Sequence, residues 1–331
     1  MNIKSSIYSD LVNLNRDKNP NNWDDKTKVG APHKPILLLS ILDGIESGWI
    51  TSNKIRFNNS LAETFFDYWK KIFNEERETT IARPLYHMKR EPFWTLIYKK
   101  GEKEFTYSPS LGSLLKRIEC FELDENFFQL MSKPSESKKL RYLLLETYFS
   151  DEVAVRLTKT HELISQSYSY SKAILSLVAQ PFYLDHNNDL EKFSFVKKPI
   201  RSKGFSRVIR HIFNDTCTVC GNRVITPNGN SIVDAAHIIP WSDYKNDDPR
   251  NGISLCKSHH WMFDNFMFTI NEGHELQVSK YLNSSKNIIS GLEEKRNKKI
   301  LLPDNPDYYP AIDAILLHNK RFKEAHDSWD R

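Results

Sequence analysis

The amino-acid sequence predicts an α+β protein built from two domains. Its length of 331 residues favours more than one domain, because single hydrophobic cores rarely grow much beyond about 250–300 residues. Helical apolar spacing dominates the first half, whereas three of the four cysteines cluster in the second half. A packed helical core in one domain and a metal-supported core in the other are therefore expected.

The first half is predicted to form a compact, mixed α/β domain over residues 1–150. Apolar spacing indicates helices over Ser5–Leu14, Lys34–Gly48, Leu61–Phe73, Leu111–Met131 (with a break) and Lys138–Phe149. Aromatic and β-branched runs indicate short strands within 49–57, 93–100 and 104–108, the last two as a hairpin around Lys100 and Gly101. This order of elements favours a winged-helix-like arrangement.

The second half is predicted to hold a connector and a smaller domain. Residues 151–200 suggest a helical stretch that passes into a polar linker near 185–200, and residues 201–331 form the second domain with a C-terminal extension. Within it, 232–239 is expected to be a strand, 242–252 a loop and 254–266 the start of a helix. Residues 300–322 should be a proline-punctuated loop that leads into a last helix.

The charge of the chain is mildly basic, with a formal net charge of +5 and a pI near 8.8. The stretch 197–210, KKPIRSKGFSRVIR, holds six basic residues and no acidic one. A solvated helix face would explain it. Such a stretch can also neutralise phosphates, and we take Arg201, Lys203 and Arg207 as candidate DNA contacts.

The sequence offers no sign of a membrane or secreted protein. Its longest mainly apolar run, Ile36–Leu42, is far shorter than the roughly 20 residues that span a bilayer. The N-terminal residues lack the apolar core and cleavage site of a signal peptide. A cytoplasmic protein without a membrane partner is expected.

Two ligand pairs predict a structural zinc site. Cys217 and Cys220 form a C-x2-C pair, and Cys256 and His259 form a C-x2-H pair. Each pair presents two ligands on a tight turn, as tetrahedral Zn²⁺ requires. The remaining cysteine, Cys120, has no such partner and is interpreted as a small core residue.

The segment between the pairs holds further residues with the chemistry of a phosphodiesterase. Asp234 and His237 lie on the predicted strand, Asn251 closes the loop, and His260 follows the zinc ligand His259. Adjacent helical residues point about 100° apart, so His260 can face a second site. Asp264 lies four residues later on the same helix face.

This constellation resembles the HNH, or ββα-metal, nuclease family, and the flanking cysteine pairs are similar to those of McrA-like restriction endonucleases. The three letters correspond to His237, Asn251 and His260. The resemblance implies a ββα-metal fold, His237 as general base, and Asn251 as the residue that fixes the loop and orients His237. It also implies hydrolysis of DNA to a 5′ phosphate and a 3′ hydroxyl.

The same resemblance implies a catalytic divalent cation, Mg²⁺ or Mn²⁺, with His260 and Asp234 as its candidate ligands. Many family members carry a ligand immediately before the general base, where this chain has Ala236. Either Asp234 or Asp264 would then supply that ligand.

The first half is similar to the sulfur-binding domain that recognises phosphorothioate-modified DNA. The likeness rests on 31–39, APHKPILLL, and 83–96, RPLYHMKREPFWTL, although His87-Met88 stands where that family often has His-Pro. It implies the DNA contacts His33, Lys34, Arg83, Tyr86, His87, Lys89, Arg90 and Trp94. The alternative is that PFWTL is a core strand and APHKP a helix start, so that Arg83, Lys89 and Arg90 alone touch DNA.

The sequence therefore predicts a modification-dependent, type IV-like restriction endonuclease that acts on double-stranded DNA, with phosphorothioate as the modification that the resemblance implies. A double-strand cut needs two sites, so a homodimer or transient pairing is expected. One alternative is a zinc-stabilised DNA-binding protein without catalysis. Another is a nuclease toxin, which would favour a translocation segment that we do not find.

Overall fold

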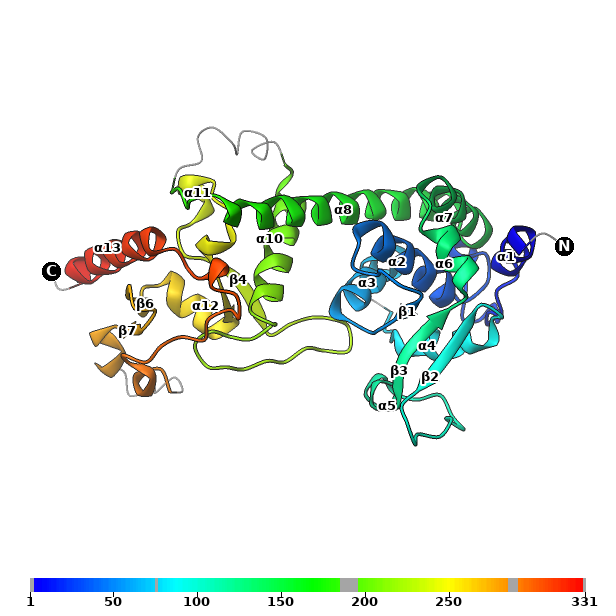
Figure 1. Ribbon diagram of the computed structural model, residues 1–331, viewed down its shortest axis with the longest axis horizontal. Coiled ribbons are helices and arrows are strands. Elements are labelled where there is room, and N and C mark those ends of the chain that lie inside the picture. The colour runs from blue at the N-terminus through cyan, green and yellow to red at the C-terminus, as the bar shows by residue number, and fades with distance from the viewer. Residues whose placement is uncertain (1–2, 75–76, 185–195, 285–290, 330–331) are drawn as a thin grey trace. The chain divides into compact units, whose positions relative to one another are not determined.

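The computed structural model describes residues 3–74, 77–184, 196–284 and 291–329 (Figure 1). The chain forms two compact units, Met1–Ser165 with Thr226–Asn230, and Gln166–Ile225 with Ser231–Arg331. Most of the linker predicted near 185–200 lies outside the described residues. Within the described ranges, no helix combines the length and the apolar character needed to cross a bilayer.

The described part of the first unit combines a group of packed helices with a small antiparallel sheet. Its helices are α1 Ile3–Val12, α2 His33–Ser47, α3 Asn59–Phe73, α4 Ala82–His87, α5 Leu111–Arg117, α6 Glu125–Met131 and α7 Pro134–Tyr148. Its strands are β1 Lys54–Ile55, β2 Trp94–Tyr98 and β3 Ile118–Leu123, in the spatial order β1-β3-β2. The mixed α/β class predicted for this half is confirmed.

Capping residues fix one end of each of the two core helices of this unit, α2 and α3. Gly48 follows α2 with a left-handed φ of 80°, and its N–H returns to the last carbonyls of the helix. Asn58 caps α3 by accepting a hydrogen bond from the N–H of Leu61. The residues of α2 are almost all buried, so this helix is the centre of the unit.

The predicted hairpin at Lys100-Gly101 is wrong. Residues 104–108 form no strand, and β2 pairs instead with β3, from within the predicted helix 111–131, with Trp94 opposite Leu123. Phe105 is buried as a loop residue, and its carbonyl accepts a hydrogen bond from the Tyr86 hydroxyl. The apolar side chain of Phe105 therefore reflects packing against the sheet rather than membership of it.

A buried polar network joins three helices of the first unit to α8, Asp151–Leu175. Asp43 in α2 accepts from Arg141 Nη2 at 2.7 Å and from the Tyr68 hydroxyl at 2.6 Å, and its Oδ1 lies 2.8 Å from His161 Nδ1. Asp43 and Arg141 are both buried, so neither charge has water as a substitute partner.

We expect Arg141→Met to lower the free energy of unfolding of the full-length protein by about 3–5 kcal/mol, because it leaves the buried Asp43 carboxylate without its cationic partner. The matched control is Arg56→Met, since Arg56 and Glu119 form an exposed pair 3.8 Å apart. Loss of an exposed pair costs about 0–1 kcal/mol. Denaturant unfolding compares the two, and equal effects would show that the network does not stabilise the unit.

The described residues of the second unit form two small antiparallel sheets and several helices besides the C-terminal part of α8. Its helices are α10 Lys198–Ile212, α11 Trp241–Tyr244, α12 Lys257–Asp264 and α13 Ile312–Trp329. Its strands are β4 Val233–His237 paired with β5 Gly252–Cys256, and β6 Phe268–Ile270 paired with β7 Leu276–Val278. The predicted strand and the predicted last helix are confirmed as β4 and α13. The helix predicted from residue 254 begins only at Lys257, because residues 254–256 belong to β5, which pairs with β4 and was not predicted.

Helix α10 lies directly against the β4–β5 sheet. A Cβ on Gly252 would stand 2.4 Å from Ile209 Cδ1 and 2.8 Å from Phe205 Cζ, so this close approach requires glycine. The apolar face of the basic stretch 197–210 is thus a core face. The packing fixes Phe205 next to the end of β4, where the candidate site begins.

Candidate functional site

The four predicted zinc ligands meet in one cluster. The ligand atoms of Cys217, Cys220, Cys256 and His259 all lie within 4.8 Å of one another. His259 Nδ1 is 3.1 Å from Cys256 Sγ and 3.5 Å from Cys217 Sγ. A left-handed Gly221, with φ of 75°, closes the first turn.

The donor set of this cluster fits zinc. Burial raises the pKa of the Cys217 and Cys256 thiols and lowers the pKa of His259. Without an ion, the neutral thiol and imidazole forms are therefore favoured in this buried position. Three soft sulfurs and one imidazole nitrogen match a closed, tetrahedral structural Zn²⁺ site.

Strands β4 and β5 place His237 and Asn251 at the same end of their sheet. His237 is the last residue of β4 and lies opposite Gly252, the residue after Asn251. Asn251 is fully buried and clamps the loop: its Oδ1 accepts from Ile239 N–H, and its Nδ2 donates to the carbonyls of Ile239 and Asn246. The loop-fixing role that the family resemblance implies thus has a concrete geometry.

The imidazole of His237 is held by an acid that the sequence did not single out. His237 Nε2 lies 2.7 Å from Asp247 Oδ1, and the ring stacks on Phe205 with centroids 3.9 Å apart and planes 5° apart. The His237 side chain remains 21% exposed, whereas Asp247 is 0% exposed. No hydrogen bond among the described residues links the Asn251 side chain to this ring, so Asp247 takes the orienting position.

Asp247 is itself surrounded by donors. The Tyr170 hydroxyl donates to its Oδ2 at 2.5 Å, and Arg201 Nη1 lies 3.3 Å from the same oxygen. The negative charge next to Tyr170 and its burial raise the pKa of that hydroxyl well above its usual value, burial being the larger cause. The acidic pair Asp247-Asp248 inside a loop was the sequence signal that could have revealed this contact.

His260 lies between two carboxylates on α12 and β4. Its Nδ1 is 3.7 Å from Asp234 Oδ2, and its Nε2 is 3.6 Å from Asp264 Oδ2. Asp234 also pairs with Lys257 at 3.2 Å. Burial raises the pKa of Asp264, while the nearby His260 and His237 act to lower it. Asp264 therefore interacts electrostatically with both histidines.

These three residues form a looser set than the zinc cluster. In the part of the chain that the structure describes, no grouping of them brings all ligand atoms within 4.8 Å of one another. Asp234 and His237 are three residues apart on a strand, which places their side chains on opposite faces. Asp264 is the carboxylate with an electrostatic link to both histidines.

The predicted DNA contacts on α10 are partly engaged within the unit. Arg201 is buried, pairs with Asp247 and stacks over the Trp241 ring at 3.7 Å. Arg207 stacks over Tyr168 at 3.5 Å. Lys203 is half-buried. Contact of these residues with DNA stays a prediction.

In the first unit, a cavity of about 250 Å³ gathers five of the eight predicted DNA contacts. Those five are His33, Lys34, Arg83, His87 and Arg90. The other lining residues are Asn15, Arg16, Asp17, Trp23, Ala31 and Pro84. Segments 31–39 and 83–96, which carry the resemblance in this half, therefore meet at one concave site.

The cavity is lined by a neutral histidine, a buried lysine and two exposed arginines. Burial lowers the pKa of His33 to about 3, so its ring is neutral, and Nε2 lies 2.9 Å from the Thr79 hydroxyl. Lys34 is buried and paired with Glu91. Arg83 and Arg90 are exposed and add positive charge. Such a site suits an anionic group.

The remaining three predicted contacts of this half lie outside the cavity lining. Trp94 is buried in β2, donates from Nε1 to the Leu85 carbonyl and stacks on Phe121. Tyr86 is buried as well, and Lys89 Nζ lies 2.9 Å from its hydroxyl. The alternative that PFWTL is a core strand is confirmed for Trp94, and DNA contact by Tyr86, Lys89 and Trp94 stays a prediction.

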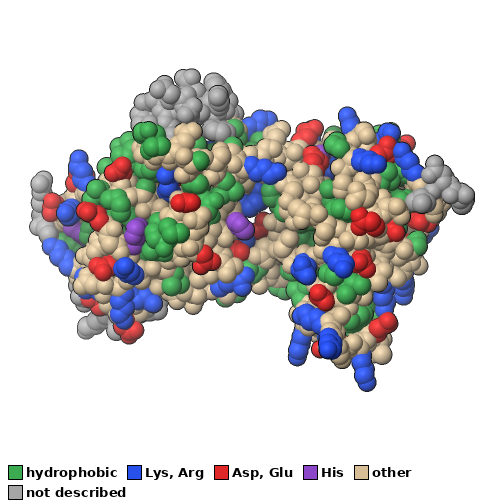
Figure 2. All heavy atoms as spheres, viewed as in Figure 1, with side chains coloured by type: hydrophobic (Ala, Val, Ile, Leu, Met, Phe, Trp, Pro, Cys, Tyr) green, Lys and Arg blue, Asp and Glu red, His purple; other side chains and the backbone are tan. Residues whose placement is uncertain are grey.

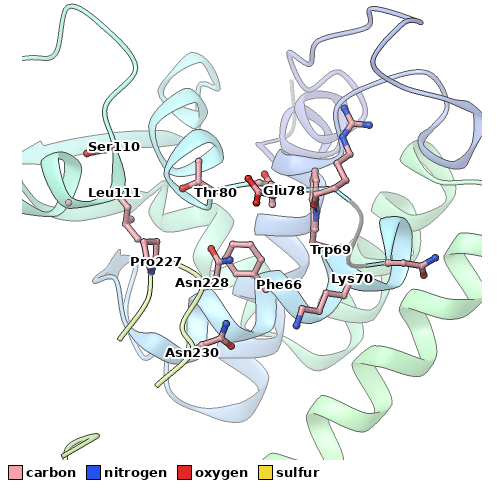
Figure 3. Close-up of a pocket in the computed structure, with 14 residues that line it drawn as sticks. Phe66, Trp69, Lys70, Glu78, Thr80, Ser110, Leu111, Pro227, Asn228 and Asn230 are labelled. Atoms are coloured by element: carbon pink, nitrogen blue, oxygen red, sulfur yellow. Dashed lines mark hydrogen bonds between the residues drawn. The ribbon is translucent and has the colours of Figure 1, made fainter. Parts of the chain in front are cut away.

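Two other surfaces of the first unit were not singled out by sequence. A larger hollow of about 840 Å³ is lined by Phe66, Trp69, Lys70 and the amides of Asn228 and Asn230, among others (Figure 3). It contains none of the predicted site residues. Lys and Arg side chains also gather at the end formed by β2, β3 and α5, which carries the exposed cations of residues 99, 100, 103 and 116 (Figure 2).

Comparison with known proteins assigns part of the second unit to a family. Residues 217–271 match the HNH endonuclease family model, so an HNH endonuclease domain lies in this region. No curated protein matches the chain. Among solved structures, a "Modification dependent TagI restriction endonuclease" is similar with 20% identity and a TM-score of 0.28, over 38% of this chain and 39% of that chain.

Proposed function

We propose that this protein, whose residues 217–271 form an HNH endonuclease domain, is a modification-dependent restriction endonuclease. In this proposal the second unit cleaves double-stranded DNA and the first unit recognises it. The observation that carries the proposal is the placement of His237, partly exposed and held by a buried acid, at the end of β4 near His260 and Asp264. A zinc-stabilised binding protein would not need that arrangement.

His237 is the proposed general base. A neutral imidazole has a pKa near working pH and can take the proton of an attacking water molecule. As the water oxygen bonds to phosphorus, the bond to the 3′ oxygen breaks. The 3′ oxyanion then takes a proton from solvent, which leaves a 5′ phosphate and a 3′ hydroxyl. Phe205 and Asp247 hold the ring, so little reorganisation is needed when the proton moves.

A divalent cation, Mg²⁺ or Mn²⁺, would neutralise charge on the scissile phosphate and on the leaving oxygen. His260 and Asp264 are its proposed ligands, because a carboxylate and an imidazole suit these ions and both residues lie near His237. Asp234 is the alternative ligand, on the other side of the His260 ring. Asn251 maintains the loop that carries Asp247.

The proposed recognition site is the 250 Å³ cavity of the first unit. A sulfur that replaces a phosphate oxygen is polarisable and weakly hydrated, so its site should combine apolar surface with donors for neighbouring phosphates. Trp23 and Pro84 supply apolar surface, and Arg83 and Arg90 supply exposed guanidinium donors. We therefore propose phosphorothioate-bearing DNA as the substrate, and two chains acting together for a double-strand cut.

The proposal is tested by cleavage of two matched plasmids, one phosphorothioate-modified in vivo and one unmodified, with Mg²⁺ or Mn²⁺. We expect the full-length protein to cut the modified plasmid alone. Arg83→Ala should weaken that cleavage by about 10- to 100-fold, because a charge-assisted contact contributes about 1.5–3 kcal/mol. Lys159→Ala is the control, since Lys159 is an exposed cation of the same unit outside the cavity.

Each other outcome selects a different function. Equal cutting of both plasmids would retain the nuclease and remove phosphorothioate recognition. Binding of plasmid without any cutting would favour the zinc-stabilised DNA-binding protein. Equal losses in Arg83→Ala and Lys159→Ala would show that the cavity has no special role.

A further inference from the structure

Asp247 lies within the matched residues 217–271 but is not one of the three residues, His237, Asn251 and His260, that carry the HNH resemblance. It is fully buried in the loop between β4 and β5. A buried carboxylate is costly unless donors surround it. Three donors do so here: His237 from β4, Tyr170 from α8 and Arg201 from α10.

We propose that Asp247 is the positioning residue that makes Nδ1 of His237 the base nitrogen. The inference rests on the proposed function and concerns a residue that does not touch the reacting atoms. It follows from the direction of one hydrogen bond. An ionised carboxylate can only accept, so His237 Nε2 must carry the hydrogen in the 2.7 Å contact.

That hydrogen bond selects one tautomer of the neutral ring. With its hydrogen on Nε2, His237 presents the lone pair of Nδ1, which is the atom able to take a proton from water. Once Nδ1 is protonated, the ring is a cation and the Asp247 carboxylate stabilises it. The proton moves from the water oxygen to Nδ1, and Asp247 stays ionised throughout.

The second oxygen of Asp247 explains why the carboxylate keeps this orientation. Tyr170 donates to Oδ2 at 2.5 Å, and Arg201 bridges toward both oxygens at 3.3 and 3.4 Å. Arg201 is immobilised in turn by the Trp241 ring. Rotation of the carboxylate would break these contacts, so α8 and α10 fix the tautomer of a residue on β4.

Other charged groups around His237 come from α12. Asp264 interacts electrostatically with His237 and His260, so it contributes a second negative charge on that side. Arg201 of α10 opposes the charge of Asp247. The effect of a substitution at Asp247 is therefore measured in variants that retain Asp264 and Arg201.

Asp247→Asn is the decisive variant. Tyr170 and Arg201 both donate to the position of Oδ2, and a guanidinium cannot accept, so the new amide should turn its oxygen toward them and its NH2 toward His237. His237 Nε2 then becomes an acceptor, the hydrogen moves to Nδ1, and the base lone pair faces away from the water. We expect cleavage to fall about 10²- to 10⁴-fold, the range of a lost general base.

The direct readout is the ¹⁵N spectrum of the His237 ring in full-length, zinc-loaded protein without Mg²⁺ or Mn²⁺. At a pH where the ring is neutral, wild type should show a protonated Nε2 and an unprotonated Nδ1. Asp247→Asn should show the reverse. The His237 signals are assigned by their loss in His237→Ala.

Tyr170→Phe tests the same inference if Asp247→Asn fails to fold. It removes one hydrogen bond, so cleavage should fall only about 2- to 10-fold and the tautomer should stay. The freed carboxylate carries more charge toward His237, so the acidic limb of the pH–rate profile should move to higher pH. Asp247→Asn should move that limb to lower pH, because the negative charge is lost.

Asp248→Asn is the matched control. Asp248 is equally buried and adjacent, but it accepts from the Arg250 backbone and pairs with the Arg250 guanidinium rather than with His237. It should lower stability and leave the tautomer and the acidic limb unchanged. If wild type cleaves and Asp247→Asn keeps the Nε2–H tautomer, the inference is overturned; if wild type does not cleave, the proposed function fails instead.

Discussion

His237→Ala is expected to reduce DNA cleavage by about 10²- to 10⁴-fold while DNA binding is retained. The reason is that the imidazole is the proposed proton acceptor, and general-base catalysis contributes a factor of this size. The ring is 21% exposed, so its removal leaves the core of the second unit filled. Single-turnover cleavage measures the loss, and a gel-shift titration measures binding.

His211→Ala is the control for that experiment. His211 is an exposed histidine of α10 in the same unit, and its removal should change neither cleavage nor binding. Cleavage by His237→Ala at the wild-type rate would show that His237 is not the base. Loss of both binding and zinc would show that the variant had unfolded, and His237→Gln would then be measured.

Removal of the structural zinc should unfold the second unit. The four ligands come from the 217–220 turn and from the junction of β5 with α12. Besides the ligands, a hydrogen bond from Thr218 N–H to the Ser254 carbonyl and the apolar core of the unit join these segments. Structural zinc sites bind with about 10–16 kcal/mol in small modules, which exceeds the stability of most domains. Cys256→Ser or a strong chelator should abolish the thermal transition of this unit.

Zinc content and thermal unfolding test that expectation together. Elemental analysis should find one zinc per chain in wild type and a large loss in Cys256→Ser. Cys120→Ala is the control, because Cys120 is buried in β3 of the first unit, away from the cluster. Wild-type stability that is unaffected by chelation and by Cys256→Ser would contradict a structural metal.

Much of the local structure could be predicted because its causes are local. Gly48 ends α2, as its sequence predicts, through hydrogen bonds to carbonyls within a few residues. The C-x2-C and C-x2-H spacings place two ligands on one turn each, so they identify the candidate zinc ligands that the fold then brings together. Apolar periodicity likewise predicts the strand within 232–239 and a helix after residue 254, but it did not predict β5 between them.

Pairing between distant segments could not be predicted by such rules. The stretch 104–108 has the composition of a strand, but 118–123 took its place beside β2, and Phe105 became a packing residue of a loop. Composition reports that a segment favours burial and extension. It does not report which of two such segments reaches the sheet edge.

The sequence by itself identified the candidate residues of this protein: the four predicted zinc ligands, His237 and His260 of the HNH resemblance, and the cationic segments of the first half. The tertiary structure decided which groups act on one another. It put Asp247, rather than Asn251, on the His237 ring, turned Arg201 inward to that acid, and brought Asp264 near both histidines. The physical reason is that ligand spacing is set along a turn, whereas these contacts form only when α8, α10 and α12 pack against one small sheet.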